Sequence, residues 1–229
     1  MSASKNWIYH PFFAPILFAA LGILPLANWL LLDTDTALWI ADTVMDDDYL
    51  LVAIYSLTMV VLYVCRPRDN NLQQNISFWI FEFLTLVALF RELGFQHWLT
   101  TTDSTAFKIR FFLNPANPLS EKIRAGLILL AVFGCLAYLV IRYTRFVIRQ
   151  FFKRNAVAWT VVTLCCITAI AKFVDRLPDN YRRFTDARLD LFWNVARTSF
   201  EEFYEAYIPL CIMIAAIQFA RLKIRLEDA

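Results

Sequence analysis

The sequence predicts an all-α protein, a polytopic transmembrane helix bundle with six spans and both termini in the cytoplasm. Of the 229 residues, 59% are hydrophobic, above the roughly 45–50% of soluble domains, and the mean hydropathy is +0.51. Six apolar stretches are each about long enough to cross a hydrocarbon core of roughly 30 Å at 1.5 Å per residue. Lysine and arginine are more frequent in the connections expected on one side of the membrane than in those on the other.

The apolar stretches are expected to form a single integral membrane domain over residues 1–229. The first stretch contains Pro15 and Pro25, runs past about 20 residues and leads into acidic residues instead of a small-residue cleavage site. We therefore expect a retained span and not a signal peptide. The six spans are expected at about 12–32, 49–65, 76–97, 123–141, 156–175 and 198–220.

Polar connections separate the first four spans. The acidic segment Asp33–Asp48 follows the first span, Arg66 and Pro67 end the second, and a polar turn over 69–75 leads into the third. The longer connection after the third span contains prolines. Its aromatic piece Phe107–Leu113 is expected to lie on the membrane surface with its phenylalanines in the headgroups.

The last two spans differ in character. The fifth is apolar over most of its length and ends before a polar loop at 179–188. A helical pattern then runs from Leu189 to about Leu222, but only Ala206–Ala220 is cleanly apolar. This pattern predicts a long helix with an amphipathic first half and a second half buried in lipid or in the bundle.

The distribution of basic residues predicts the orientation, because cytoplasmic loops are enriched in lysine and arginine. The connection from Arg142 to Arg154 holds five basic residues and the C-terminal tail holds three, whereas Asp33–Asp48 holds none. Both termini are therefore expected inside, and the compact loops favour a bacterial cytoplasmic membrane. Arg176 and its basic neighbours would then lie outside, where an anionic headgroup or phosphate would explain them.

Several classes of protein are disfavoured. The formal net charge is only +2, unlike the strongly basic balance of a nucleic-acid binder. The five cysteines lack CxxC spacing and lie mostly in apolar stretches, so neither a disulfide framework nor a zinc knuckle is expected. The sequence has no P-loop, GxSxG, HExxH or GxGxxG motif, and its four glycines cannot build a phosphate-cradling loop.

Ionisable residues of three spans fall at about one height in the bilayer. Arg91 and Glu92 lie roughly 23 Å above the cytoplasmic edge of the third span, and Lys172 lies roughly 24 Å up the fifth. In the descending sixth span Glu205 and Glu201 reach roughly 23 and 29 Å, on one face of the helix. Each such residue costs on the order of 3 kcal/mol to insert and usually faces the bundle interior. A polar pocket near the outer leaflet is therefore expected.

Two neighbouring features add to this layer. Pro209 cannot donate to the carbonyl of Glu205, so that oxygen is expected to be free and the helix kinked, which suits a cation or a proton. His97 stands near the outer end of the third span and is a candidate base or metal ligand beside Glu92. A divalent metal at the carboxylate cluster is one option, and no other cofactor is indicated.

The leading hypothesis is a protein that binds or acts on a lipid or lipid-linked anionic substrate at the outer leaflet, with membrane lipids as partners. Acidic groups and the imidazole would supply acid/base or metal-binding groups, and basic groups would hold the headgroup. The candidate catalytic residues are Glu92, His97, Glu201 and Glu205; the candidate substrate-binding residues are Arg91, Lys172, Asp175, Arg176 and Glu202.

Three other interpretations stay open at this point. The same residues could form a proton or cation pathway in a transporter or channel, with Glu82 as the deeper step and Pro209 as the break in the helix. They could instead form a buried ion-pair network that only fixes helix register. The chain could also be an accessory subunit, or a homo-oligomer, whose aromatic faces bind another membrane protein.

Overall fold

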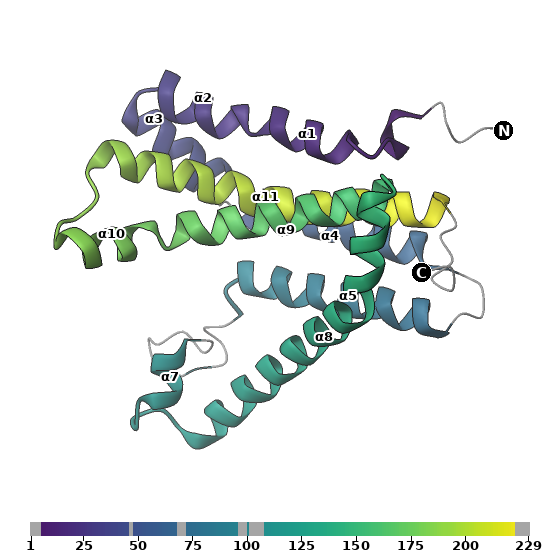
Figure 1. Cartoon of the computed structure of the whole chain (residues 1–229). Coiled ribbons are helices and arrows are strands. Elements are labelled where there is room, and N and C mark those ends of the chain that lie inside the picture. The colour runs from purple at the N-terminus through teal and green to yellow at the C-terminus, as the bar shows by residue number, and fades with distance from the viewer. Residues whose placement is uncertain (1–5, 46–47, 68–71, 96–99, 101–107, 223–229) are drawn as a thin grey trace.

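The computed structural model describes residues 6–45, 48–67, 72–95, 100 and 108–222. Over these residues the protein is all-helical, with 86% of residues in helices and no strand. The helices, labelled in Figure 1 where space allows, are α1 (Phe13–Leu21), α2 (Ile23–Leu31), α3 (Thr34–Trp39), α4 (Asp48–Cys65), α5 (Leu72–Glu92), α7 (Ile109–Leu113), α8 (Leu119–Phe152), α9 (Ala156–Asp175), α10 (Leu177–Thr185) and α11 (Leu191–Leu222), with a 3-10 turn η2 (Trp7–Tyr9) and a π-helical turn η3 (Ile40–Met45).

Within the described residues, each of the six stretches expected to span the membrane is mostly helical. Four helical segments of the described chain are long and apolar enough to cross a bilayer: Phe13–Leu31, which combines α1 and α2, and the helices α8, α9 and α11. The apolar helix Leu50–Cys65 within α4 is shorter. These helices are compatible with an integral membrane protein. The count of six spans and the cytoplasmic termini stay predictions.

The first expected span, over 12–32, agrees with the candidate span Phe13–Leu31, which consists of two successive helices. The helices α1 and α2 meet at Gly22, and Pro25 lies in the first turn of α2, where its missing N–H is not needed. The bundle is tight at this junction, because a Cβ added to Gly22 would lie 3.3 Å from the Tyr204 hydroxyl of α11. The glycine therefore permits the close approach of the two segments.

Polar side chains begin two of the helices. The carboxylate of Asp33 accepts a hydrogen bond of 3.0 Å from the backbone N–H of Thr36 at the start of α3. This bond holds the pKa of Asp33 below its ordinary value. The side chain of Asn155 accepts a bond of 2.9 Å from the N–H of Val157 and begins α9.

The helix α11 is the centre of the bundle, with α1 and α2 on one side of it and α4 on another (Figure 1). Its residues contribute to three hydrophobic clusters. Tyr207 and Cys211 pack with Phe18 of α1 and Ile167 of α9. Further clusters join α11 to α4 and α5 through residues that include Leu51, Tyr55, Leu89 and Ala206, and through Leu62, Phe78 and Ala216.

The helix α8 lies at the periphery and crosses the other helices obliquely (Figure 1). It has 34 residues and rises about 51 Å. Only 6% of the 18-residue apolar stretch within it is buried by the rest of the protein. The Tyr143 hydroxyl ties it to α5 by donating to Ser77 Oγ over 2.6 Å. At its other end Phe111 of α7 is fully buried against Ala125, so Phe111 does not lie in the headgroups as the sequence had suggested.

The described segments nearest the two chain ends lie at the same end of the bundle (Figure 1). A buried side chain joins them: Gln218 of α11 donates to the carbonyl of Ile8 over 2.7 Å and accepts from the Thr160 hydroxyl of α9, also over 2.7 Å. Both Gln218 and Thr160 are fully buried. The amide group therefore fixes the N-terminal segment, α9 and α11 against one another.

Replacing this amide should destabilise the protein. In Gln218→Leu the Thr160 hydroxyl and the Ile8 carbonyl lose their partners in the core, so we expect the free energy of unfolding in detergent to fall by about 2 kcal/mol. Gln150→Leu, at a partly exposed position of α8, is the control and should change stability by less than about 0.5 kcal/mol. Equal losses in denaturant unfolding curves of the two variants would contradict the role of Gln218.

Candidate functional site

Three helices bring opposite charges together at Glu205. Arg91 of α5 contacts one carboxylate oxygen of this residue, with Nη2 3.0 Å from Oε2. Lys172 of α9 contacts the other, with Nζ 3.2 Å from Oε1. The sequence predicted that the third, fifth and sixth apolar stretches would carry charge to one layer, and in the structure these three side chains meet.

The contacts at Glu205 extend into a chain of ion pairs. Arg91 Nη2 also lies 3.1 Å from Glu92 Oε1 on the same helix. Lys172 Nζ lies 3.4 Å from Asp175 Oδ2 one turn further along α9. Each cation is thus shared between a carboxylate of its own helix and the carboxylate of Glu205. We call these five residues the charge cluster.

A second ion pair lies beside the charge cluster on α11. Arg197 pairs with Glu201 and also donates to the hydroxyl of Thr198 over 3.1 Å. Glu201 is close enough to Asp175 and Glu205 to feel both of their charges. Sequence reasoning missed Arg197, although its position four residues before Glu201 is the spacing of an ion pair along one helix face.

The exposure of these side chains depends on their charge. Glu92 and Glu205 are 14% and 15% exposed, and Glu201 is 14% exposed, whereas Arg91 and Lys172 are 45% and 50% exposed. Asp175, at 35%, is intermediate. The buried layer is therefore anionic, and the layer that meets the surroundings is mainly cationic.

The ends of α5 and α9 account for the position of the two cations. Arg91 lies in the last turn of α5 and Lys172 in the last turn of α9. Positive side chains there offset the partial negative charge of the helix C-terminus. Glu205 instead lies inside α11, one turn before the buried Pro209. The Thr58 hydroxyl of α4 donates to the Pro209 carbonyl over 3.2 Å, which ties α4 to this part of α11.

Tyr55 of α4 closes the cluster from the bundle side. It is 6% exposed and packs with Leu89 and Ala206, which lie on the two helices that carry Arg91 and Glu205. Its ring feels the charges of Arg91, Glu92 and Glu205. A phenol here supplies a further polar group to the buried layer, and the sequence gave no spacing signal that would mark it.

Two further candidate residues lie on helices that carry the charge cluster or directly follow them. Arg176 is exposed at the end of α9, directly after Asp175. Glu202 is half-buried on α11. His97 lies outside the described residues, so its assignment as a base or ligand stays a prediction.

Glu82, the deeper acid of the transport interpretation, lies near a separate cation. It feels the charge of Arg66, whose guanidinium stacks 4.6 Å from the centre of the Trp79 ring and 5.5 Å from that of Tyr63. One carboxylate oxygen of Glu82 and one guanidinium nitrogen of Arg66 are buried without a hydrogen bond. Glu82 is therefore not one of the charge cluster's ion-paired residues.

A metal-binding arrangement is not formed by the described side chains. Among them, no three His, Cys, Asp or Glu residues are grouped closely enough to hold a metal ion. The carboxylates of Glu92 and Glu205 instead contact a guanidinium and an ammonium group. The option of a divalent metal at the carboxylate cluster thus has no ligand set in this part of the chain, and no chemical step is assigned to it.

Comparison of the sequence with protein-family models and with characterised proteins finds no match, and comparison of the fold with solved structures finds none either. Function is therefore inferred from the charge cluster and the surfaces around it.

The shared carboxylate should couple Lys172 to the stability of the bundle. We expect Glu205→Gln to lower the free energy of unfolding by about 2 kcal/mol, because it leaves two cations without their common anion. Since Lys172 is half exposed, a double-mutant cycle with Lys172→Met should give a coupling energy of only about 0.5–1 kcal/mol.

The control for this cycle is Asp35→Asn, an exposed acid in the first turn of α3, which should change stability by less than about 0.5 kcal/mol. Unfolding curves in detergent provide the measurement. Strict additivity of the Glu205 and Lys172 substitutions would show that the two side chains do not interact.

Proposed function

We propose that this protein binds the anionic group of a lipid or lipid-linked substrate at the charge cluster and supplies acid/base groups to it. One observation carries the proposal: Arg91 and Lys172 are about half exposed, while the carboxylates of Glu92, Glu201 and Glu205 behind them are 14–15% exposed. An arriving phosphate or carboxylate would meet the cations first. The buried acids would then lie next to the bound group.

The proposed roles follow from the chemistry of each side chain. The planar guanidinium of Arg91 suits two-point contact with a phosphate, and the ammonium of Lys172 acts as a mobile point charge. An anion that takes one contact from each cation relaxes their hold on Glu205. The freed carboxylate of Glu205, with Glu92 and Glu201 beside it, would accept or return a proton from the bound group.

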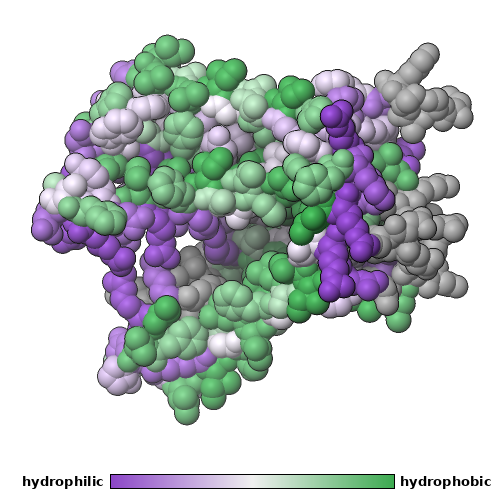
Figure 2. Space-filling model, in the orientation of Figure 1, coloured by the Kyte–Doolittle hydropathy of each residue, from purple (hydrophilic) through white to green (hydrophobic). Residues whose placement is uncertain are grey.

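The surroundings of the cluster support an anionic ligand. Arg176 follows α9, and Arg182 and Arg183 are exposed on α10, which continues from the same end. Figure 2 shows hydrophilic side chains beside a hollow between the α9–α10 side and the α7–α8 side of the molecule. In the predicted orientation this end faces outward. The preferred ligand is therefore a lipid-linked anion of the outer leaflet.

The site can be tested by protection of Lys172 from acetylation, because its amine is half exposed. Dioctanoyl phosphatidate should protect Lys172 in detergent-solubilised protein, as measured by mass spectrometry of peptides, while dioctanoylglycerol, which lacks the phosphate, should not. Arg91→Gln removes the second cation, so half-maximal protection should need about tenfold more phosphatidate, equivalent to about 1.4 kcal/mol.

Two comparisons keep this test specific. Arg188→Gln removes an exposed cation outside the charge cluster and should leave the protection curve unchanged. Acetylation of Lys122 near the start of α8, whose amine donates to the backbone carbonyl of Asn114, reports general effects of the lipid on the amines. Protection of Lys172 that is equal for phosphatidate and dioctanoylglycerol, or unaffected by Arg91→Gln, would refute the assignment.

A proton or cation pathway is the second candidate, and the charge balance is the observation that favours it. Four carboxylates, of Glu92, Asp175, Glu201 and Glu205, face three cations, of Arg91, Lys172 and Arg197. One excess negative charge in a partly buried layer would attract a proton or a metal cation. Gradient-driven flux in proteoliposomes that Glu205→Gln abolishes would favour this function over lipid binding, and absence of flux would remove it.

A further inference from the structure

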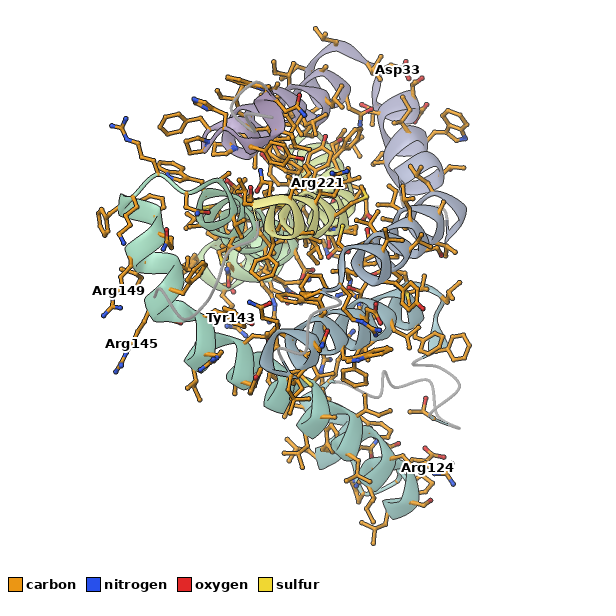
Figure 3. The ribbon with its side chains drawn as sticks, turned by 90° about the vertical axis from the view of Figure 1, so that its right-hand side faces the viewer. Asp33, Arg124, Tyr143, Arg145, Arg149 and Arg221 are labelled. Carbon is orange, nitrogen blue, oxygen red and sulfur yellow. The ribbon has the colours of Figure 1, made fainter. Side chains whose placement is uncertain are left out.

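A row of basic side chains follows the C-terminal half of α8, far from the charge cluster in the chain and on a different helix. Arg142, Arg145, Arg149 and Lys153 are all exposed. Their spacing of three, four and four residues places them along one face of the helix. Figure 3 shows Arg145 and Arg149 pointing away from the bundle, and Figure 2 shows a continuous hydrophilic band over this half of α8.

The length of α8 places this row at a membrane–water interface. The helix rises about 51 Å over its 34 residues, and a hydrocarbon core spans roughly 30 Å. Its apolar part ends at Ile141, which is 81% exposed, and Arg142 begins the basic part. If the apolar part lies in the lipid, the basic row must begin where phospholipid phosphates lie.

An open groove of about 530 Å³ occurs at this boundary. Its lining residues in the described chain, Tyr138, Ile141, Arg142 and Arg145, all lie on α8, so a bound molecule would also contact the surrounding lipid. The lining changes along the helix, from an aromatic and an aliphatic side chain on the apolar side to two guanidinium groups on the basic side. A phospholipid has the same order of apolar and charged parts.

The orientation of the groove is fixed by two side chains of α8 that flank the basic row. Tyr143 points toward α5 and its hydroxyl donates to Ser77 Oγ over 2.6 Å, and Phe146 is buried. Rotation of α8 would break this bond and expose that ring. The basic face is thus held outward before any ligand arrives, so little conformational entropy is lost on binding.

We propose that this groove binds the headgroup of an anionic phospholipid at the end of the bundle that holds both chain ends. Arg142 and Arg145, which are about 4.5 Å apart along the helix axis, would contact the phosphate oxygens. Tyr138 and Ile141 would contact the glycerol and the first acyl carbons. Arg149 and Lys153 extend the positive surface toward water and favour anionic over zwitterionic lipids.

The test is retention of lipid by the full chain after extraction from nanodiscs of equal parts phosphatidylglycerol and phosphatidylcholine. Native mass spectrometry should detect phosphatidylglycerol on the protein in at least tenfold excess over phosphatidylcholine. The variant Arg142→Gln/Arg145→Gln should lose at least nine-tenths of this lipid. Arg142→Lys/Arg145→Lys, which keeps the charge but not the planar fork, should retain an intermediate amount.

The matched control is Arg124→Gln/Arg188→Gln, which removes two exposed arginines, one near the start of α8 and one between α10 and α11, and should retain the lipid. Inorganic phosphate at 10 mM should not displace the lipid, and displacement would mean that the groove recognises free phosphate. Equal retention of the two lipids, or equal loss in both double variants, would overturn the proposal. Neither result affects the protection of Lys172 from acetylation. The proposal for the groove on α8 and the proposal for the charge cluster are therefore tested independently.

Discussion

The carboxylate of Glu205 is the interaction on which the arrangement of the polar layer depends. It accepts from Arg91 and Lys172 through different oxygens, at 3.0 and 3.2 Å, and so joins the ends of α5 and α9 to the middle of α11. Neither cation contacts the other's own-helix partner, so Glu205 is the link between Glu92 and Asp175 in the described ion pairs. Apolar packing would permit these helices to slide, whereas a shared carboxylate specifies their height.

The ion pairs of Glu205 with Arg91 and Lys172 hold the charged layer together, yet an anionic ligand can replace Glu205 in them. Burying an ion pair has a desolvation penalty that the attraction between the charges only partly offsets. Because Arg91 and Lys172 are about half exposed, both the desolvation penalty and the attraction are smaller here. An anionic ligand can therefore replace Glu205 as partner of either cation at a small net cost. A fully buried network would fix helix register but would not offer its cations to a ligand.

Much of this arrangement could be predicted from the sequence. Counting residues from one edge of each apolar stretch placed Arg91, Lys172 and Glu205 at about one height, because the rise per residue of an α-helix is nearly constant. The close approach of the Tyr204 hydroxyl to Gly22 could not be predicted this way, since it joins residues that are distant in the sequence. Phe111 was misplaced for the same reason: its burial against Ala125 depends on a tertiary contact.

The positions of the charged residues along their helices account for their different exposure. The helices α5 and α9 end at Glu92 and Asp175, within one turn of Arg91 and Lys172, and both cations are about half exposed. In contrast, α11 begins at Leu191 and continues for about 14 residues before Glu205, roughly 21 Å, which keeps this carboxylate inside packed helix. Cations at helix ends and an acid within a helix give an exposed positive layer over a buried negative one.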